Sequence, residues 1–300
     1  QKAERQTKQI ELAQIISDSL YSATFLAFTG SDQFLRERYA NEVLHHDSPA
    51  CPHYHQALGN PCHVTIFGTE REELQIESEI TRCHTWKRTG DIASVRCWTA
   101  ADKPIQLCGH GLLCAVAAWG QFDPSIRRLE MNDLPVSFQI EDEIAWIGLP
   151  SIGCDACAVP AWVGEYFSAV PWRAATAGDS EGYLILEWPA DFDLEQLTVP
   201  GVALAKRTQR SIIATCAAPH HPELDIMLRY FAPNHGVPED TATGSAMRVL
   251  ASYWMRRELN GGLAAFQCSK RGGALYSRLR DELTWIGGRV TVNKAEKYAA

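Results

Sequence analysis

The chain has 300 residues, of which 46% are hydrophobic, and this is enough for one large or two ordinary domains with real cores. The formal net charge is -8 and the sequence pI is about 5.7, which argues against a nucleic acid as partner. No run approaches the roughly 20 apolar residues of a membrane span, and the charged N-terminus lacks the apolar region of a secretory signal, so we expect a soluble protein without a membrane partner.

The predicted elements begin with two helices, over residues 2–20 and 33–44, where apolar side chains recur near one face. Short β-rich runs bounded by turn residues then predict strands, at 62–67, 93–99, 143–149, 182–188, 211–217, 225–231 and 288–292. Two apolar helices interrupt these strands, at about 109–119 and 244–256. The order of elements predicts a mixed α/β chain.

The ten cysteines are sparse, and several lie in apolar segments. Cys97, Cys114 and Cys216 have the pattern of small buried hydrophobic residues, so we expect a reducing, cytoplasmic location and no disulfide framework. Cysteines and histidines between residues 51 and 84 fit no standard zinc spacing, and the CDAC motif at 154–157 falls in what we interpret as a connecting segment. We therefore predict no metal site and ordinary packing or loop roles.

The two apolar helices belong to an internal repeat. Aligning Gly109 with Gly244 also aligns Cys108 with Thr243, and a tryptophan follows each glycine at the same spacing. Upstream, VRCWTA matches LRYFAP after a two-residue adjustment. Such a repeat indicates a duplicated structural unit, and the break falls in the segment LPSIGCDACAVPAW, which is rich in proline, glycine and small residues. The predicted domains are residues 1–150 and 151–300.

The start of each repeated helix has the features of an anion-binding site. A helix N-terminus presents unpaired backbone N–H groups and a partial positive charge, and Gly109 and Gly244 allow a ligand to approach that backbone closely. If both starts face one cleft, they suit a small carboxylate, or the enolate formed when a proton leaves the neighbouring carbon. The sequence therefore predicts proton transfer at carbon.

Four side chains at these starts can move or orient protons. The helix end favours a thiolate at Cys108, and His110 can donate, accept or orient at neutral pH. Asp240 and Ser245 flank TATG at the second start. Each also has a structural interpretation, as a packed cysteine, a helix cap or a loop carboxylate. Thr243 stands opposite Cys108 in the repeat, and its weakly acidic hydroxyl excludes a symmetric two-thiol racemase.

Four segments resemble, in the same order, the PhzF (phenazine biosynthesis F-like) family: GNPCHVTIF, VRCWTAADKPIQLCGHGLL, DIMLRYFAPNHGVPEDTATGSA and GGALYSRLRDELTWIGGRVTV. They run from about Gly59 to Val292. The resemblance implies an α/β (α+β) diaminopimelate epimerase-like fold, with two similar domains, each with a sheet wrapped around a central helix, and the active site between them. It also implies no metal or organic cofactor, a homodimer, and an isomerase mechanism.

In that mechanism a glutamate moves a proton between two substrate carbons, helped by a histidine, an aspartate and a serine. By motif, the helpers are His110 in CGHG, Asp240 in PED and Ser245 in TGSA, and Cys108 adjoins them. The substrate-binding positions that follow from the same motifs are Asn60 in GNP, with Pro61 beside it, and Gly109, Gly111, Thr243 and Gly244.

The glutamate belongs to a Ser-Glu-Thr type segment between GNP and CGH. The pair Ser78-Glu79 in ESEITRCHTW lies in the right neighbourhood, and Glu77 competes for the role. A glutamate in an apolar, partly dry cleft would have the raised pKa that an acid/base needs. The distance from GNP to Glu79 is shorter than the family pattern, and residues 1 to about 55 have no counterpart in it.

The leading prediction is a cofactor-independent isomerase or epimerase that acts on a small carboxylate or amino-acid-like metabolite. CGHG also resembles the proline-racemase family, whose first catalytic cysteine lies in that motif. The pair Cys108 and Thr243 resembles the arrangement in hydroxyproline dehydratases of that family. Two alternatives therefore stay open: a proline-racemase-like dehydratase or racemase that uses Cys108, and a catalytically silent small-molecule-binding protein of the same fold.

Overall fold

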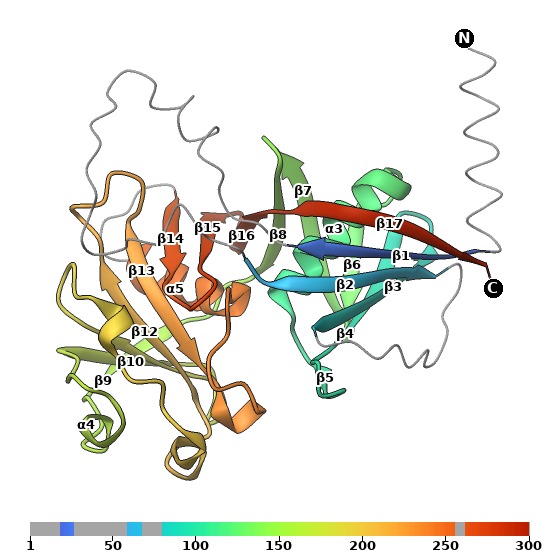
Figure 1. The fold of residues 1–300 in the computed structure, drawn as a ribbon. Coiled ribbons are helices and arrows are strands. Elements are labelled where there is room, and N and C mark those ends of the chain that lie inside the picture. The colour runs from blue at the N-terminus through green and yellow to red at the C-terminus, as the bar shows by residue number, and fades with distance from the viewer. Residues whose placement is uncertain (1–18, 27–58, 68–79, 256–261, 300) are drawn as a thin grey trace. The chain divides into compact units, whose positions relative to one another are not determined.

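The computed structural model describes residues 19–26, 59–67, 80–255 and 262–299 (Figure 1). Most of the helix predicted over 2–20 and all of that over 33–44 lie outside these ranges. Ser19 and Leu20, which close the first predicted helix, instead open a strand. Within the described ranges, no helix has the length and apolar character needed to cross a membrane.

The chain divides into two compact units. Unit 1 contains the first strand, residues 61–147 and the last strand, whereas unit 2 contains Gly59, Asn60 and residues 148–289. The elements of unit 1 are β1 (Ser19–Leu26), β2 (Pro61–Phe67), β3 (Thr81–Thr89), β4 (Ile92–Trp98), β5 (Pro104–Ile105), α3 (Gly109–Phe122), β6 (Arg128–Met131), β7 (Leu134–Glu141) and β17 (Thr291–Ala299). One strand, β8 (Ile144–Pro150), begins in unit 1 and ends in unit 2.

Unit 2 has its own helix and strands. Its elements are β9 (Cys154–Cys157), α4 (Val163–Tyr166), β10 (Arg173–Ala177), β11 (Tyr183–Glu187), β12 (Ser211–Ala217), β13 (Ile226–Phe231), α5 (Gly244–Met255), β14 (Leu263–Gln267), β15 (Gly273–Arg280) and β16 (Leu283–Arg289). Short 3-10 helices occupy Leu194–Gln196, Val202–Lys206 and Pro233–His235.

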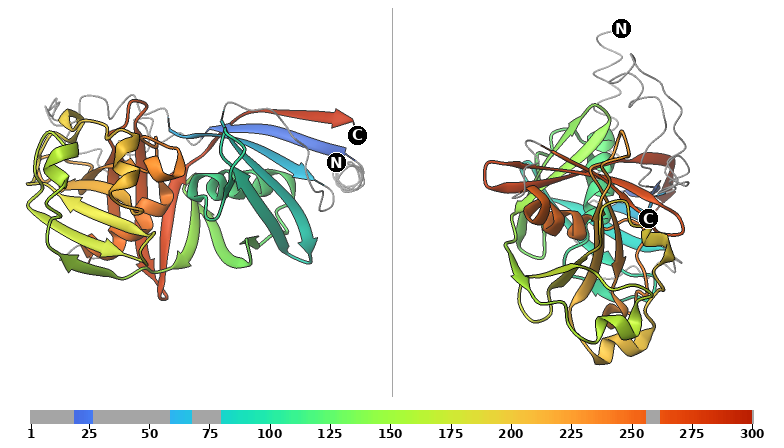
Figure 2. Two further views of the ribbon diagram at one scale, coloured as in Figure 1. Left: turned by 90° about the horizontal axis from the view of Figure 1, so that it is seen from below. Right: turned by 90° about the vertical axis from the view of Figure 1, so that its left-hand side faces the viewer.

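The two units share one strand order. In unit 1 the order is β17-β1-β2-β3-β4-β6-β7, and the pairs β2–β3 and β4–β6 are parallel. In unit 2 the order is β9-β10-β11-β12-β13-β14-β15-β16, and β11–β12 and β13–β14 are parallel at the equivalent places. Figure 2 shows α3 and α5, each lying against strands of its own unit. Each helix begins at the predicted glycine and comes after the fifth strand of its unit's order along the chain: α3 follows β4 and the short β5, and α5 follows β13 and a 3-10 helix.

A side-chain motif repeats with the topology. On β3, the Thr85 hydroxyl donates to the carbonyl oxygen of Ser94 on β4 at 2.7 Å. The Thr85 hydroxyl oxygen in turn accepts the indole N–H of Trp119, from the central helix α3, at 2.8 Å. Thr85 is fully buried. A single hydroxyl thus joins two strands and the helix of unit 1, and it satisfies an indole that would otherwise be buried without a partner.

Unit 2 contains the same motif. Thr215 on β12 donates to the carbonyl oxygen of Met227 on β13 at 2.8 Å, and it accepts the Trp254 indole N–H from α5 at 3.3 Å. The internal repeat predicted from the aligned glycines and tryptophans therefore has a structural counterpart in strand order, in helix start and in this hydrogen-bonded triplet.

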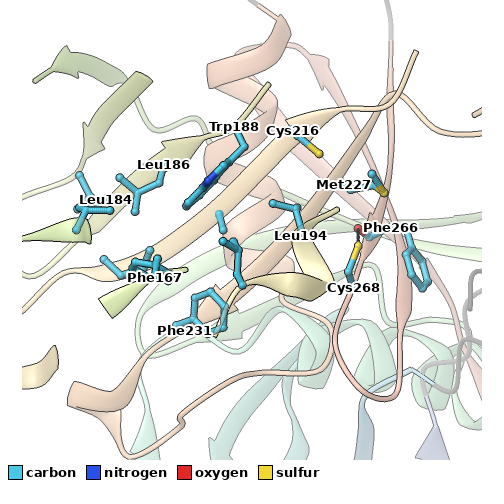
Figure 3. Close-up of a cluster of buried hydrophobic side chains, with 14 of the residues drawn as sticks. Phe167, Leu184, Leu186, Trp188, Leu194, Cys216, Met227, Phe231, Phe266 and Cys268 are labelled. Atoms are coloured by element: carbon cyan, nitrogen blue, oxygen red, sulfur yellow. Dashed lines mark hydrogen bonds between the residues drawn. The ribbon is translucent and has the colours of Figure 1, made fainter. Parts of the chain in front are cut away.

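The buried cores are formed by side chains that alternate along the strands and recur on one face of each helix. Alternate residues of β4 are buried, Ala93, Val95 and Cys97, as expected for a strand with one face on the helix. Unit 2 encloses an aromatic cluster in which the Phe167 ring lies 6.1 Å from Trp188 and 5.7 Å from Phe231 (Figure 3). Burial of such rings is the main favourable term for a unit of this size. The three cysteines predicted to be buried are each at most 2% exposed.

Two sequence predictions were wrong. CDAC is not a connecting segment but β9, which pairs antiparallel with β10 from Ala174↔Cys157 to Ala177↔Cys154. The strand predicted over 288–292 is two strands, because β16 ends at Arg289 and β17 begins at Thr291. That break coincides with the passage from unit 2 to unit 1.

Candidate functional site

The first helix start leaves backbone donors without helical partners. Cys108 is the N-cap of α3, with φ -114° and ψ 92°, and its side chain caps no backbone N–H of the helix. The first intrahelical bond joins Leu112 N to Cys108 O at 2.9 Å. Helical geometry therefore leaves the N–H groups of the first turn, from Gly109 to Gly111, without carbonyl partners in the helix. Both glycines are buried.

Cys108 and His110 lie together at this start. The Cys108 sulfur is 3.7 Å from His110 Nδ1 and 4.0 Å from Nε2. A hydrogen bond from the Cys97 thiol, and then the charge of His110, lower the pKa of Cys108 below its ordinary value against the opposing effect of burial. Cys108 is 3% exposed. The arrangement places a thiol of lowered pKa next to an imidazole, as in cysteine sites with enhanced reactivity.

The second helix start has a different polar arrangement. Thr243 O accepts the first intrahelical bond, from Met247 N, at 3.2 Å. Its hydroxyl donates to Asp240 Oδ2 at 2.6 Å and accepts from Gln267 Nε2 at 3.1 Å, and its N–H donates to Gln267 Oε1 at 2.8 Å. Every polar group of Thr243 is thus engaged, with Asp240 in the loop, Gln267 on β14 and Met247 in α5. The hydroxyl proton of Thr243 is therefore committed to Asp240.

Asp240 organises the loop before α5. Its Oδ1 accepts from Asn60 Nδ2 at 2.9 Å and from Thr241 N at 2.8 Å, while Oδ2 accepts from Thr243. Asn60, 8% exposed, also donates to Ala242 O at 3.3 Å. A carboxylate with three such donors is held rigidly in position. The geometry therefore makes Asp240 a residue that fixes the helix start, with Asn60 and Thr243 as its side-chain partners.

The sequence analysis did not identify Arg229, the residue that holds this loop against β13. Arg229 on β13 is 5% exposed and makes a bidentate contact with Glu239, at 2.6 Å from Nε to Oε1 and 2.9 Å from Nη2 to Oε2. Its Nη1 donates to the carbonyl oxygens of Leu194 and Leu197 at 3.0 and 2.6 Å. The two adjacent carboxylates of PED therefore have different structural roles. Glu239 connects the loop to β13, and Asp240 connects it to the start of α5.

Ser245 lies near a phenol that the sequence analysis also missed. Ser245 is half-buried in the first turn of α5, and Tyr230 on β13 is 9% exposed. Burial raises the pKa of the Tyr230 phenol well above its ordinary value, and hydrogen bonds with Ser211 and Ser245 only partly offset this. A phenol that stays neutral can orient the Ser245 hydroxyl. The repeat offered a signal for Tyr230, because VRCWTA aligned with LRYFAP places it opposite Cys97.

The structure thus brings the predicted residues together in two groups. Unit 1 holds Cys108, Gly109, His110 and Gly111 at the start of α3, and unit 2 holds Asn60, Asp240, Thr243, Gly244 and Ser245 at the start of α5. The predicted acid/base Glu79 and its competitor Glu77 lie outside the described residues. Across the part of the chain that the structure describes, no cluster of three or more histidine, cysteine or carboxylate side chains could hold a metal ion.

A cavity of about 480 Å³ in unit 2 contains none of these residues. It is lined by β9, β10 and the last turns of α5, including Trp172, Ser252 and Tyr253. Ser245 stands at the opposite end of α5. This cavity is therefore separate from the group of predicted residues in its unit.

Comparisons with known proteins agree with the motifs. A family model described as phenazine biosynthesis-like protein (PhzC-PhzF) matches residues 157–294. The chain is 30% identical over 227 residues to an uncharacterized isomerase of Vibrio cholerae, a match that covers 72% of this chain and 77% of the relative.

Solved structures also resemble the chain. A PhzF-family phenazine biosynthesis protein from Enterococcus faecalis gives a TM-score of 0.72 at 20% identity, over 93% of this chain and 99% of that one. A hydroxyproline epimerase from Agrobacterium vitis, solved with bound trans-4-hydroxy-L-proline, gives a TM-score of 0.51 at 11% identity, over 94% and 93%. At these identities the likeness concerns the fold, and it confirms the predicted α/β architecture of two similar units, each with a sheet around a central helix.

Proposed function

Because this chain belongs to the PhzF (phenazine biosynthesis-like) family, we propose that it is a cofactor-independent isomerase or epimerase that moves a proton at a carbon atom of a small carboxylate or amino-acid-like metabolite. Four motifs predicted this family, and the comparisons confirm it. The observation that carries the proposal is the duplicated helix start, with a proton-transfer side chain in the first turn of each central helix.

Substrate binding follows from the backbone at these starts. The first-turn N–H groups of α3 and α5 supply donors and a positive dipole end, which suit a carboxylate or a developing enolate. The buried Gly109 and Gly244 present no side chain there. A carboxylate can therefore be bound by peptide groups, without a lysine or arginine at either start.

Proton transfer is assigned to side chains with distinct roles. His110 and Ser245 orient the substrate and its leaving or arriving proton, with Tyr230 setting the direction of the Ser245 hydroxyl. Asp240 and Asn60 hold the second start in place. Glu79 is the proton shuttle, a role that is supported by the family resemblance alone. The homodimer and the cytoplasmic location stay predictions.

Hydrogen exchange at carbon tests this proposal directly. The protein is incubated in heavy water with a pool of small chiral carboxylates and amino acids, and mass spectrometry detects any compound that gains one carbon-bound deuterium. We expect one such compound, and we expect Glu79→Gln to abolish the gain because an amide cannot shuttle the proton. Glu282→Gln, at an exposed turn, is the matched control and should behave as wild type.

Two results would contradict the proposal. Unchanged exchange in Glu79→Gln would remove that residue from its role. A pool compound that binds tightly in calorimetry but shows no exchange with the wild-type protein would instead favour a catalytically silent binding protein of the same fold.

One observation favours a second candidate, a proline-racemase-like dehydratase or racemase. The Cys108 thiol lies beside His110, and its lowered pKa suits a base that takes the α-proton. In that reaction water leaves a hydroxyproline-like substrate. Cys108→Ser should then abolish turnover, whereas the isomerase mechanism predicts only a partial loss. Measuring both deuterium gain and loss of water with this variant separates the two reactions.

A further inference from the structure

Three thiols surround Gly111 in the first turn of α3. A Cβ atom built on Gly111 would lie 2.7 Å from the Cys97 sulfur and 2.9 Å from the Cys108 sulfur. The Cys83 sulfur lies 3.6 Å from the Gly111 carbonyl oxygen, to which it donates. The three cysteines are 0 to 3% exposed. The Cys97 and Cys108 sulfurs crowd the same point, and a hydrogen bond joins the two thiols.

The fold places these thiols together from different elements. Cys97 on β4 pairs in register with Cys83 on β3 and with Ile105 on β5. Cys108 follows three residues after Ile105, at the N-cap of α3. The face of β4 that carries Cys97 is the buried one, against the helix. The short hairpin of β4 and β5 therefore reverses the chain direction, so that Cys108 lies close to Cys97.

The two neighbours differ in chemistry. The pKa of Cys108 is lowered, by the hydrogen bond from Cys97 and by His110, whereas that hydrogen bond raises the pKa of Cys97. These directions favour the negative charge on Cys108 and the proton on Cys97. A low-pKa thiolate with a second thiol beside it is the arrangement of a nucleophilic cysteine and a resolving cysteine.

We propose that Cys108 and Cys97 form a hydroperoxide-reactive dithiol, which closes to a disulfide in unit 1. The Cys108 thiolate attacks one oxygen of hydrogen peroxide, so that an S–O bond forms, the O–O bond breaks and hydroxide leaves. The Cys97 sulfur then attacks the Cys108 sulfenic acid, an S–S bond forms, and its proton leaves with the hydroxyl as water. The hydroxide takes up the proton that Cys108 had released. The dithiol is oxidised, and one peroxide is reduced to two waters.

The disulfide would change the first helix start. It removes the thiolate beside His110 and ties the N-cap of α3 to β4. This modification does not depend on the proposed isomerase reaction, and its test uses no substrate.

The test is peptide mapping of the full-length protein after oxidation. Reduced protein, freed of reductant, is treated with equimolar hydrogen peroxide, alkylated and digested without reductant. Trypsin leaves Cys97 and Cys108 on one peptide, because proline follows Lys103, and cleavage before Asp102 separates them. We expect those two fragments to stay joined until reductant is added, and fragmentation to place the bond on Cys108 and not on Cys114.

Variants assign the two roles. Cys97→Ser should leave a sulfenic acid on Cys108, which dimedone captures, and Cys108→Ser should slow peroxide consumption by about tenfold or more, because the thiolate is the nucleophile. Cys157→Ser removes an exposed thiol of unit 2 and should change neither result. Oxidation of Cys157 while Cys97 and Cys108 stay reduced in the wild-type protein would overturn the proposal. So would a link from Cys97 to another cysteine.

Discussion

Gly111→Ala tests the packing of the first helix start. The new methyl group would lie 2.7 Å from the Cys97 sulfur and 2.9 Å from the Cys108 sulfur, both closer than the 3.0 Å below which something must shift. Both sulfurs are at most 3% exposed, so neither can move into solvent. Overpacking of this kind costs about 1–3 kcal/mol.

Helix propensity opposes that cost. Replacing glycine with alanine in a helix stabilises it by up to about 1 kcal/mol. We therefore expect a net loss of up to about 2 kcal/mol in the free energy of unfolding of unit 1. Urea unfolding followed by tryptophan fluorescence measures it. Gly120→Ala is the control in the same helix, because its methyl would meet only the Cδ1 atom of the exposed Ile140, at 2.8 Å. We expect Gly120→Ala to be as stable as the wild-type protein or more stable.

A second substitution tests the cause. If the clash with Cys97 is responsible, combining Gly111→Ala with Cys97→Ala should cost less than the sum of the two single changes, by about 1 kcal/mol. Additive losses would refute the packing argument, as would a Gly111→Ala protein no less stable than the Gly120→Ala protein.

Three further predictions concern stability. Thr85→Val should lower the unfolding free energy by about 1–3 kcal/mol, because an indole N–H and a carbonyl are left unsatisfied, and Thr215→Val should cost less, since its indole bond is 3.3 Å and not 2.8 Å. Equal stability of both variants and wild type in urea would contradict the repeated motif. Burial, with Arg82 adding to it, lowers the pKa of His84 to about 4, so the unfolded chain binds the proton first as pH falls. Stability should therefore drop by roughly 3 kcal/mol between pH 6.5 and 4, and His84→Gln should flatten this part of the pH profile. Glu239→Gln should cost about 3–5 kcal/mol, because it leaves the buried Arg229 charge without its partner; a loss below 1 kcal/mol would count against that pairing.

The sequence predicted the parts of the fold that carry strong local signals. Both central helices begin where predicted, at Gly109 and Gly244, because a polar, glycine-containing start precedes a long apolar run. The strands predicted at 211–217 and 62–67 agree to within a residue, since both are short β-rich runs between turns. Hairpins whose turns contain no glycine were not predicted. The turn between β15 and β16 is made by Asp281 and Glu282, with φ of 52° and 63°, a mirror-image turn that aspartate tolerates.

The site was less accessible to sequence reasoning where its contacts are long-range. Motif comparison identified His110, Asp240 and Ser245 as candidates. No signal in the sequence near Thr243 indicates its hydrogen bonds with Gln267 on β14. That contact depends on the parallel pairing of β13 with β14, which places Leu228 beside Gln267. The anchor of Glu239 likewise depends on β13 and not on residues near the motif.

The most direct test of the account is the rate at which the protein's substrate, once found by exchange, gains carbon-bound deuterium in variants of the two helix starts. His110→Gln and Ser245→Ala should each slow the gain by about 10²-fold or more, since each removes a group that orients or moves the proton. Cys157→Ser should leave it unchanged. A wild-type rate in either variant would contradict the role proposed for the helix start that carries it.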